Sequence, residues 1–363
     1  MAVTMAEVAE RAGVSPATVS RVLNGGHPVA GDTRSRVERA IEDLGYVGHA
    51  PARSLAAATS ELIGLVVPDL AEPWAAALTS AAQRTLSGAA GTQRLTIVCP
   101  TGGSPDREAA ALARLLAHRA AGVLLAGPET GDATQRRLVA TRLALLGAHG
   151  VPVVLCGRPA PRPPTPPGPD APAPIPPGPA PIVLGFDERG GARRVTEHLW
   201  NLGHRRIGRI TGPADHPVTR ARDAGHREAL APHGPRALAE IEDLTARTTG
   251  TAAGGRRAAR ALLRRRPDLT ALLTGDDPVT GGALAALRDE GLRIPADVSV
   301  AGFGGVTPAW TDPLALTTVE TPLRRAGELA ARLLLGAVRP APGEITLPTP
   351  LRVRESTAPP PLE

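Results

Sequence analysis

The sequence contains no lysine, so all 41 of its basic residues are arginine. This bias is typical of a GC-rich genome, because arginine codons can be GC-rich and lysine codons cannot. It is therefore no evidence for nucleic-acid binding. The first 60 residues are not basic either, because six arginines there are balanced by six acidic residues. If this region binds DNA, a dimer and the N-termini of helices must supply the contacts that net charge does not.

Cysteine is almost absent as well. Cys99 and Cys156 are far apart in the sequence, and each lies in an apolar run. Buried strand thiols are favoured over a disulfide or a metal site, and we expect no bound metal. The chain shows no signal peptide and no apolar stretch long enough to span a membrane. We therefore expect a soluble cytoplasmic protein with no membrane partner.

Common catalytic motifs are also missing. The sequence has no phosphate loop of the GxxxxGK[ST] type, no His-Glu-x-x-His and no G-x-S-x-G. Asp276 and Asp277 could form a carboxylate pair for acid–base chemistry, but two adjacent residues at a helix N-terminus more often cap the helix. We expect no catalytic residues and no cofactor. The 363 residues, 42% of them apolar, are enough for two or three globular domains.

The N-terminal stretch carries the pattern of two short helices. Thr4 and Glu7 form a capping box that starts the first helix. Gly13 can end that helix in the left-handed conformation. Ser15 is a second N-cap, and Pro16 follows it at the first helical position. Two short helices joined by a tight turn predict a helix-turn-helix, whose second helix enters a major groove of DNA.

This second helix divides into two faces. Val19, Val22 and Leu23 are expected to point inward. The small or polar residues that can approach phosphates and base edges are Ala17, Thr18, Ser20, Arg21 and Asn24. Arg21 is the one long donor among them, and arginine to guanine is the commonest specific base contact. On this motif alone, an ordinary helical hairpin packed on a larger domain remains the alternative.

Several further motifs, in their order along the chain, resemble the LacI/GalR family of bacterial repressors. They lie at residues 9–15, 18–24, 45–46, 52–55, 63–68, 197–199, 202–205 and 298–303. The resemblance spans nearly the whole chain. It implies a homodimeric, ligand-controlled transcription repressor that binds a palindromic operator in double-stranded DNA and is nucleoid-associated when bound. A solute-binding protein of a transporter is the alternative, but it should carry an export signal and lack residues 4–55.

The resemblance also extends the expected DNA contacts. They include Thr4, Ser15, Pro16, Tyr46, Ala52 and Leu55. Residues 49–60 would form a hinge helix only on the operator, with Leu55 wedged into the minor groove to kink the DNA. A flexible linker is the alternative for this segment. The family usually caps its third helix with a serine, and Ala30 stands at that position here, so the cap is lost or Asp32 or Thr33 replaces it.

From residue 62 onward, short apolar runs alternate with helical segments. The expected strands are 62–67, 95–99, 122–126 and 151–156 in a first set, and 182–186, 207–211, 269–273 and 298–303 in a second. This βαβ repetition predicts two doubly wound parallel sheets. We therefore expect an α/β core of two lobes, like a periplasmic binding protein. Closure of such lobes around a ligand is a standard switching motion.

The expected domains follow from these patterns and from the family's three crossings between lobes. They are a helix-turn-helix domain at 1–48, a hinge at 49–60, a first core lobe at 61–158 and 322–345, a Pro-rich insertion at 159–181, and a second core lobe at 182–320 and 346–363. The insertion holds 13 prolines and would lie at the first crossing, near Pro181. We interpret it as a solvated spacer, with a ligand for a proline-reading groove as the alternative.

Open α/β sheets bind ligands beyond the carboxyl ends of their strands. With the resemblance, this rule indicates Trp74, Arg222, Asp276 and Gly304 as effector-binding residues. Trp74 could stack on a sugar or base, or simply cap the cleft wall. Arg222 matches an arginine that grips the effector. Gly304 stands where the family usually has an aspartate that holds sugar hydroxyls, and so leaves a hole. We therefore expect an effector that is less sugar-like than is usual in the family: with Arg222 as a fixed cation, an anionic metabolite such as a phosphorylated or carboxylated compound, with a sugar as the alternative.

Overall fold

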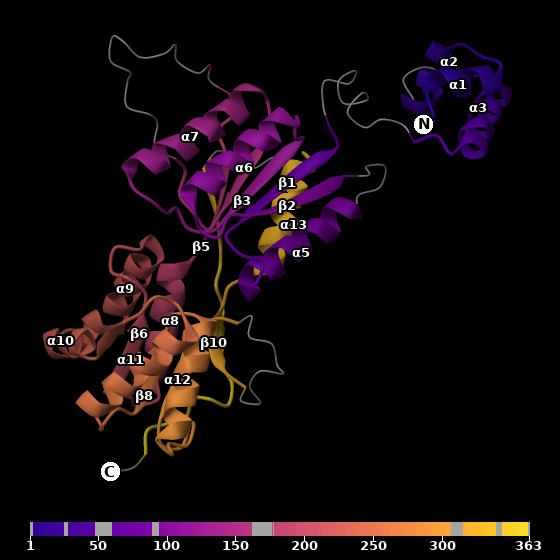
Figure 1. Cartoon of the computed structure of the whole chain (residues 1–363). Coiled ribbons are helices and arrows are strands. Elements are labelled where there is room, and N and C mark those ends of the chain that lie inside the picture. Colours follow the sequence, from indigo (N-terminus) through magenta and orange to yellow (C-terminus); the bar gives the residue numbers. More distant parts are fainter. Residues whose placement is uncertain are drawn as a thin grey trace, which may run out of the picture.

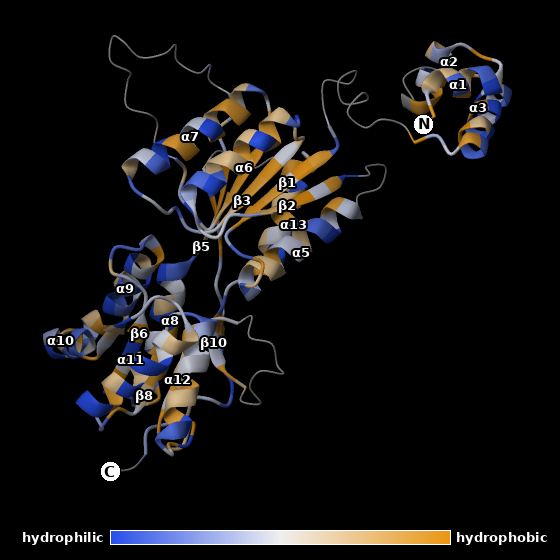
Figure 2. Cartoon of the chain, viewed as in Figure 1, coloured by the Kyte–Doolittle hydropathy of each residue, from blue (hydrophilic) through white to orange (hydrophobic). Residues whose placement is uncertain are grey.

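The computed structural model describes residues 3–24, 28–47, 60–88, 94–161, 176, 178–305, 315–338 and 343–361. Figure 1 shows these residues as three parts: a small helical N-terminal domain and two α/β lobes, which are joined to each other by connecting segments of the chain. Figure 2 shows that the strands of the first lobe are strongly hydrophobic, whereas the outer faces of the helices are mostly hydrophilic. Separate clusters of buried apolar residues lie in the two lobes, so each lobe has its own core.

The N-terminal domain consists of α1 (Met5–Ala12), α2 (Pro16–Asn24) and α3 (Gly31–Leu44). They pack around a small apolar core that includes the fully buried Val8, Val19 and Val37. Burial of Val19 and Val22 confirms the predicted inward face of the second helix.

The helix ends also follow the sequence signals. The Glu7 amide donates to Thr4 Oγ1 at 3.4 Å, and the Thr4 amide donates to Glu7 Oε2 at 2.6 Å, which completes the capping box. Gly13 ends α1 with a φ of +64°. Ala30 occupies the N-cap of α3, and no side chain caps that helix. The serine cap is therefore lost rather than replaced by a neighbour.

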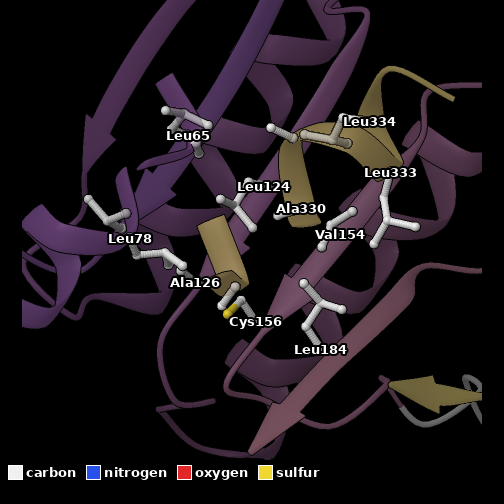
Figure 3. Close-up of a cluster of buried hydrophobic side chains, with 14 of the residues drawn as sticks. Leu65, Leu78, Leu124, Ala126, Val154, Cys156, Leu184, Ala330, Leu333 and Leu334 are labelled. Carbon is white, nitrogen blue, oxygen red and sulfur yellow. The ribbon is translucent and has the colours of Figure 1, made fainter. Parts of the chain in front are cut away.

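The first lobe is a six-stranded parallel sheet with the order β11-β5-β4-β3-β1-β2. Its strands are β1 (Leu62–Val67), β2 (Leu95–Pro100), β3 (Gly122–Ala126), β4 (Val153–Cys156), β5 (Ile182–Phe186) and β11 (Glu344–Leu347). Helices α5 (Pro73–Ser87) and α13 (Leu323–Leu334) cover one face, where Figure 3 shows Leu65, Leu124 and Leu184 packed beside residues of α13. Helices α6 (Pro105–Ala117) and α7 (Ala133–Ala148) cover the other face.

The second lobe has the sheet order β12-β10-β9-β8-β6-β7, parallel except for β12. Its strands are β6 (Ile207–Thr211), β7 (Thr245–Arg247), β8 (Ala271–Thr274), β9 (Ser299–Gly304), β10 (Thr317–Glu320) and β12 (Leu351–Arg352). Its helices are α8 (Glu188–Asn201), α9 (Pro217–Leu230), the short η1 (Ala231–His233), α10 (Pro235–Asp243), α11 (Ala252–Arg265) and α12 (Asp277–Asp289). The two sheets confirm the predicted two-lobed α/β core.

The structure corrects the boundary between the lobes. Residues 182–186 were expected to open the second lobe, but they form β5, which pairs with β4 on one side and β11 on the other. These neighbours bury Leu184 completely within the first lobe. The chain therefore first crosses at Asp187, not near Pro181, and the Pro-rich insertion joins two strands of one lobe. Most of that insertion, 162–175 and 177, lies outside the described residues.

The other two crossings lie near their predicted places. The chain returns from β10 to α13 at residues 321–322, and it leaves β11 for β12 at residues 348–350. The second crossing leaves a strand of the second sheet at its carboxyl end, and the first and third leave strands of the first sheet in the same way. The carboxyl edges of both parallel sheets therefore face the junction between the lobes, which is where ligands bind in such sheets.

Candidate DNA-binding face and effector site

The N-terminus of α2 forms the candidate DNA-binding face. Ser15 Oγ accepts a hydrogen bond from the Thr18 amide at 3.2 Å and lies 2.9 Å from Thr18 Oγ1. The exposed candidates are Thr4, Ser15, Pro16, Ala17 and Arg21, while Thr18 and Ser20 are half-buried. The helix thus turns its polar face outward, because its apolar face is used by the three-helix core.

Residues at the start of α3 also border this face. A groove lies between α2 and the start of α3, and its lining residues are Val14, Ser15, Thr18, Arg21, Pro28, Val29, Thr33 and Arg36. Thr33 and Arg36 were not among the contacts that the sequence predicted. Their spacing of three residues is the signal that places them on one side of a helix. Arg21 and Arg36 form no ion pair with any residue that the structure describes.

Other predicted DNA contacts are less well defined. Tyr46 is half-buried against the three-helix core, which leaves only part of its ring accessible. The side chain of Asn24 and the whole of Ala52 and Leu55 lie outside the described residues. The hinge helix and its minor-groove wedge therefore stay predictions.

The candidate effector site is built around Arg222, which lies on α9 at the carboxyl edge of the second sheet. Its Nε donates to Glu188 Oε2 at 2.6 Å, and its Nη1 donates to the carbonyl of Gly275. The guanidinium carbon lies 4.0 Å from the centre of the Phe303 ring, a cation–π contact. Only 15% of the Arg222 side chain and 14% of Glu188 are exposed. The charge of Arg222, which the sequence indicated as a fixed cation for an anionic ligand, is therefore already balanced by Glu188.

Asp276 caps α12, as its position in the sequence indicated. Its Oδ1 accepts a hydrogen bond from the Val279 amide at 2.9 Å. Burial raises the pKa of this carboxyl, whereas the Val279 amide and the charge of Arg222 lower it. Asp276 and Arg222 are thus electrostatic neighbours at the same edge of the sheet.

Gly304 does not leave the predicted hole. It ends β9 with a φ of +121°, and a Cβ built there would lie 2.5 Å from Asp277 Oδ2. The carboxylate of Asp277 already occupies the space in which a side chain at position 304 would begin. A φ of this size is also essentially restricted to glycine. A carboxylate is therefore present beside position 304, and it comes from α12 rather than from β9.

Trp74 belongs to the other lobe. It lies in the first turn of α5, after the carboxyl end of β1, and packs half-buried against the first-lobe core. Its Cη2 would lie 3.3 Å from a Cβ built on Gly127. The structure thus groups Arg222, Asp276 and Gly304 on the second lobe, while Trp74 approaches the junction from the first.

The described residues also bear on the expected absences. No helix among them is both long and apolar enough to cross a membrane. They contain no group of three or more side chains that could hold a metal ion.

A helix-turn-helix domain joined to a two-lobed binding core defines a class of ligand-regulated DNA-binding proteins. Residues 4–48 match the model described as bacterial regulatory proteins, lacI family, and residues 196–357 match the periplasmic binding protein-like domain. The chain is 33% identical to the HTH-type transcriptional regulator CelR of Thermobifida fusca, over 97% of this chain and 98% of that protein. It is 35% identical to MalR of Streptomyces coelicolor, over 99% and 97%.

Solved structures agree. The lac repressor dimer bound to operator and the anti-inducer ONPF matches with a TM-score of 0.78 and 27% identity, covering 99% of this chain and 100% of that one. A CelR–cellobiose complex matches with a TM-score of 0.61 and 31% identity, covering 98% and 99%. The chain belongs to the LacI family of bacterial regulatory proteins. It is an HTH-type transcriptional regulator and not an enzyme, which confirms the predicted family, fold and function.

Proposed function

We propose that the protein is a repressor that binds a palindromic operator as a homodimer and responds to a neutral, hydroxyl-rich effector. The observation that carries the proposal is the outward polar face of α2, with Arg21 in the groove between α2 and α3. Arg21 is suited to read one base edge of each half-site. Ser15, Thr18, Thr33 and Arg36 border the same groove and are suited to hold phosphates. Such a repressor works in the cytoplasm, at the nucleoid when bound.

The remaining predicted contacts fit the same docked position. Thr4, Pro16 and Ala17 are exposed at the N-termini of the two helices, where backbone amides can bind phosphate. Ser20 continues the polar face of α2, and Asn24 and Tyr46 would contact the DNA beside it. Ala52 and Leu55 would enter the minor groove from the hinge, where a leucine wedge can kink the duplex.

An exposed apolar edge supports the homodimer. β2 is the last strand of the first sheet and pairs only with β1 among the described strands. Leu95 is 64% exposed and Ile97 is 41% exposed on this edge. Open apolar edge strands invite pairing and are usually covered. A second copy packed across a two-fold axis would cover both and would also set the spacing of the two recognition helices.

The effector site favours a neutral ligand over an anion. Arg222 is already paired with Glu188, and Asp276 and Asp277 add two more carboxylates at the same edge. Carboxylate oxygens accept hydrogen bonds from hydroxyl groups, whereas they repel a ligand carboxylate or phosphate. A CelR structure contains cellobiose, so an oligosaccharide is the first class of effector to test.

Selection of bound DNA from genomic fragments, followed by footprinting of the purified protein, tests the proposal. We expect a protected site with dyad symmetry, whose half-sites are separated by about one helical turn. Its position beside particular genes would indicate the regulated pathway. A protected site without a dyad, or binding by a monomer, would contradict the dimeric operator mode. Cellobiose and maltose added to the footprint show whether a neutral sugar changes the occupancy of the site.

A further inference from the structure

We propose that Glu188 determines which class of effector the second lobe accepts. By occupying the guanidinium of Arg222, it makes the site reject acidic ligands and leaves the arginine as a donor for neutral oxygen atoms. The inference rests on the proposed effector site and adds a specificity-determining residue to it.

The contacts of Arg222 show which of its donors remain. A guanidinium carries five N–H groups, one on Nε and two on each Nη. Nε is used by Glu188 and Nη1 donates to the Gly275 carbonyl, while the Phe303 ring supports one face. The Nη2 group has no partner among the residues that the structure describes. Its two N–H groups can donate to a hydroxyl or ring oxygen, although the charge of the guanidinium is already balanced.

Glu188 is held in place and is not a mobile competitor. It is the first residue of α8, where the helix dipole favours a carboxylate. The preceding Asp187 is the first crossing between the lobes and is fixed from several sides. Its amide donates to the Leu347 carbonyl at 2.9 Å, and its carbonyl accepts from Thr349 Oγ1 at 2.8 Å. Its Oδ2 accepts from Arg194 Nη2 at 3.2 Å.

The other ionisable groups near Arg222 do not make the site more favourable for acidic ligands. Asp276 feels the charge of Arg222 and adds a second carboxylate. Arg220 is exposed, and its guanidinium donates to the backbone carbonyl of Asp215. Burial lowers the pKa of His216, with a further contribution from Arg222, so its imidazole carries less positive charge near neutral pH than a free histidine would. With Asp277 at the same edge, an acidic ligand would therefore join one guanidinium and three carboxylates in a poorly solvated site, where like charges repel strongly.

The test measures binding of a matched pair of probes, cellobiose and its carboxylate analogue cellobionate, by calorimetry. Glu188→Gln removes the charge of Glu188 but keeps its size. We expect it to tighten cellobionate binding about tenfold or more, because a fixed negative charge is removed within a few ångströms of the ligand. Binding of cellobiose should change less than about threefold, because a neutral ligand does not feel this charge.

Glu228→Gln is the matched control. Glu228 pairs with Arg189, so it makes the same kind of contact between α8 and α9, but at an exposed position. Glu228→Gln should leave the affinities for cellobiose and for cellobionate unchanged. Glu188→Asn repeats the test with a shorter amide if the glutamine variant folds poorly, and thermal unfolding checks each variant.

Operator binding, measured on the same proteins, distinguishes failure of the Glu188 proposal from failure of the proposed repressor function. If cellobionate binding does not increase in either Glu188 variant, or if it increases equally in Glu228→Gln, Glu188 does not determine specificity. This conclusion holds even if no probe binds any variant, provided that the operator footprint persists. Loss of the footprint in the wild-type protein would instead contradict the proposed function.

Discussion

Asp277 and Gly304 compete for one space. A Cβ on Gly304 would lie 2.5 Å from Asp277 Oδ2 and 2.8 Å from its Cγ, so the carboxylate on α12 fills the position that a side chain at the end of β9 would take. A carboxylate is thus present at this edge of the sheet, although β9 itself ends in glycine.

This relationship predicts that position 304 cannot regain a side chain without cost. Gly304→Ala should lower the free energy of unfolding by about 2–4 kcal/mol, from backbone strain at a φ of +121° together with the collision. Gly304→Asp should cost more, because it also places two carboxylates together.

Gly343 provides the control, since its φ is also +121° but a Cβ there would meet nothing within 4 Å. Gly343→Ala therefore measures the conformational cost alone. Denaturant titrations of both alanine variants give the difference. Equal losses at the two positions would mean that Asp277 moves aside easily and does not define the site.

The two arginines of the N-terminal groove should affect DNA binding in different ways. Arg21→Ala should relax the preference at one base pair of each half-site and cost about 1–3 kcal/mol per contact. Arg36→Ala should weaken binding to all sequences and reduce the slope of log affinity against log salt by about one per protomer.

Arg39→Ala is the control, because Arg39 is exposed on α3 but does not line the groove. Affinities for the selected operator, for single-base variants of it and for random DNA, each at several salt concentrations, separate the two roles. A uniform loss for Arg21→Ala would remove it from base reading. An unchanged salt slope for Arg36→Ala would remove it from phosphate binding.

His226 should make the second lobe sensitive to acid. It is buried, and its Nδ1 lies 2.6 Å from Thr196 Oγ1. Burial holds the pKa of His226 well below its usual value, with smaller contributions from Arg209 and Arg222. The folded state therefore binds fewer protons than the unfolded state. The stability that neutral His226 contributes is present above pH 6.5 and is lost as the pH falls below that value.

The expected slope is up to about 1.4 kcal/mol per pH unit for a single group. Chemical denaturation between pH 7.5 and 5 should show it in the wild-type protein and should show less of it in His226→Gln. His149→Gln, at an exposed position on the first lobe, should keep the full slope. An identical pH dependence in all three proteins would show that His226 does not contribute.

Some of the fold could be predicted from the sequence because the signals are local. The capping box at Thr4 and the left-handed Gly13 depend only on residues within one turn, and both are present. The apolar run at 182–186 correctly predicted a strand, but an apolar strand has the same pattern in either sheet. Only the pairing with β4 and β11 places it in the first lobe. Strands as short as β7 and β12 have too few residues to show a period.

The candidate effector site also combines residues that the sequence indicated with contacts that depend on how distant elements pack. The resemblance indicated Arg222, Asp276 and Gly304, and the structure places all three at the carboxyl edge of the second sheet. The sequence did not indicate the residues that contact these three and change their chemistry. Glu188 is 34 positions from Arg222, and nothing in the sequence relates the two. The substitution at Gly304 was visible in the sequence, but its compensation by Asp277 depends on how two elements pack.

The exposed edge of β2 gives the sharpest test of the assembly. Ile97→Asp places a charge in the middle of this strand, where the wild-type side chain is 41% exposed. A monomer would solvate that charge at little cost, whereas a dimer that buries the edge would have to desolvate it without a partner. We expect Ile97→Asp to sediment as a monomer at concentrations at which the wild type is a dimer. We also expect its operator affinity to fall by at least about a hundredfold, because each half-site would then be held by one recognition helix alone.

Leu138→Asp serves as the control, since Leu138 is 39% exposed on α7, away from that edge. A dimer that persists in Ile97→Asp with unchanged operator affinity would show that the subunits associate through another surface.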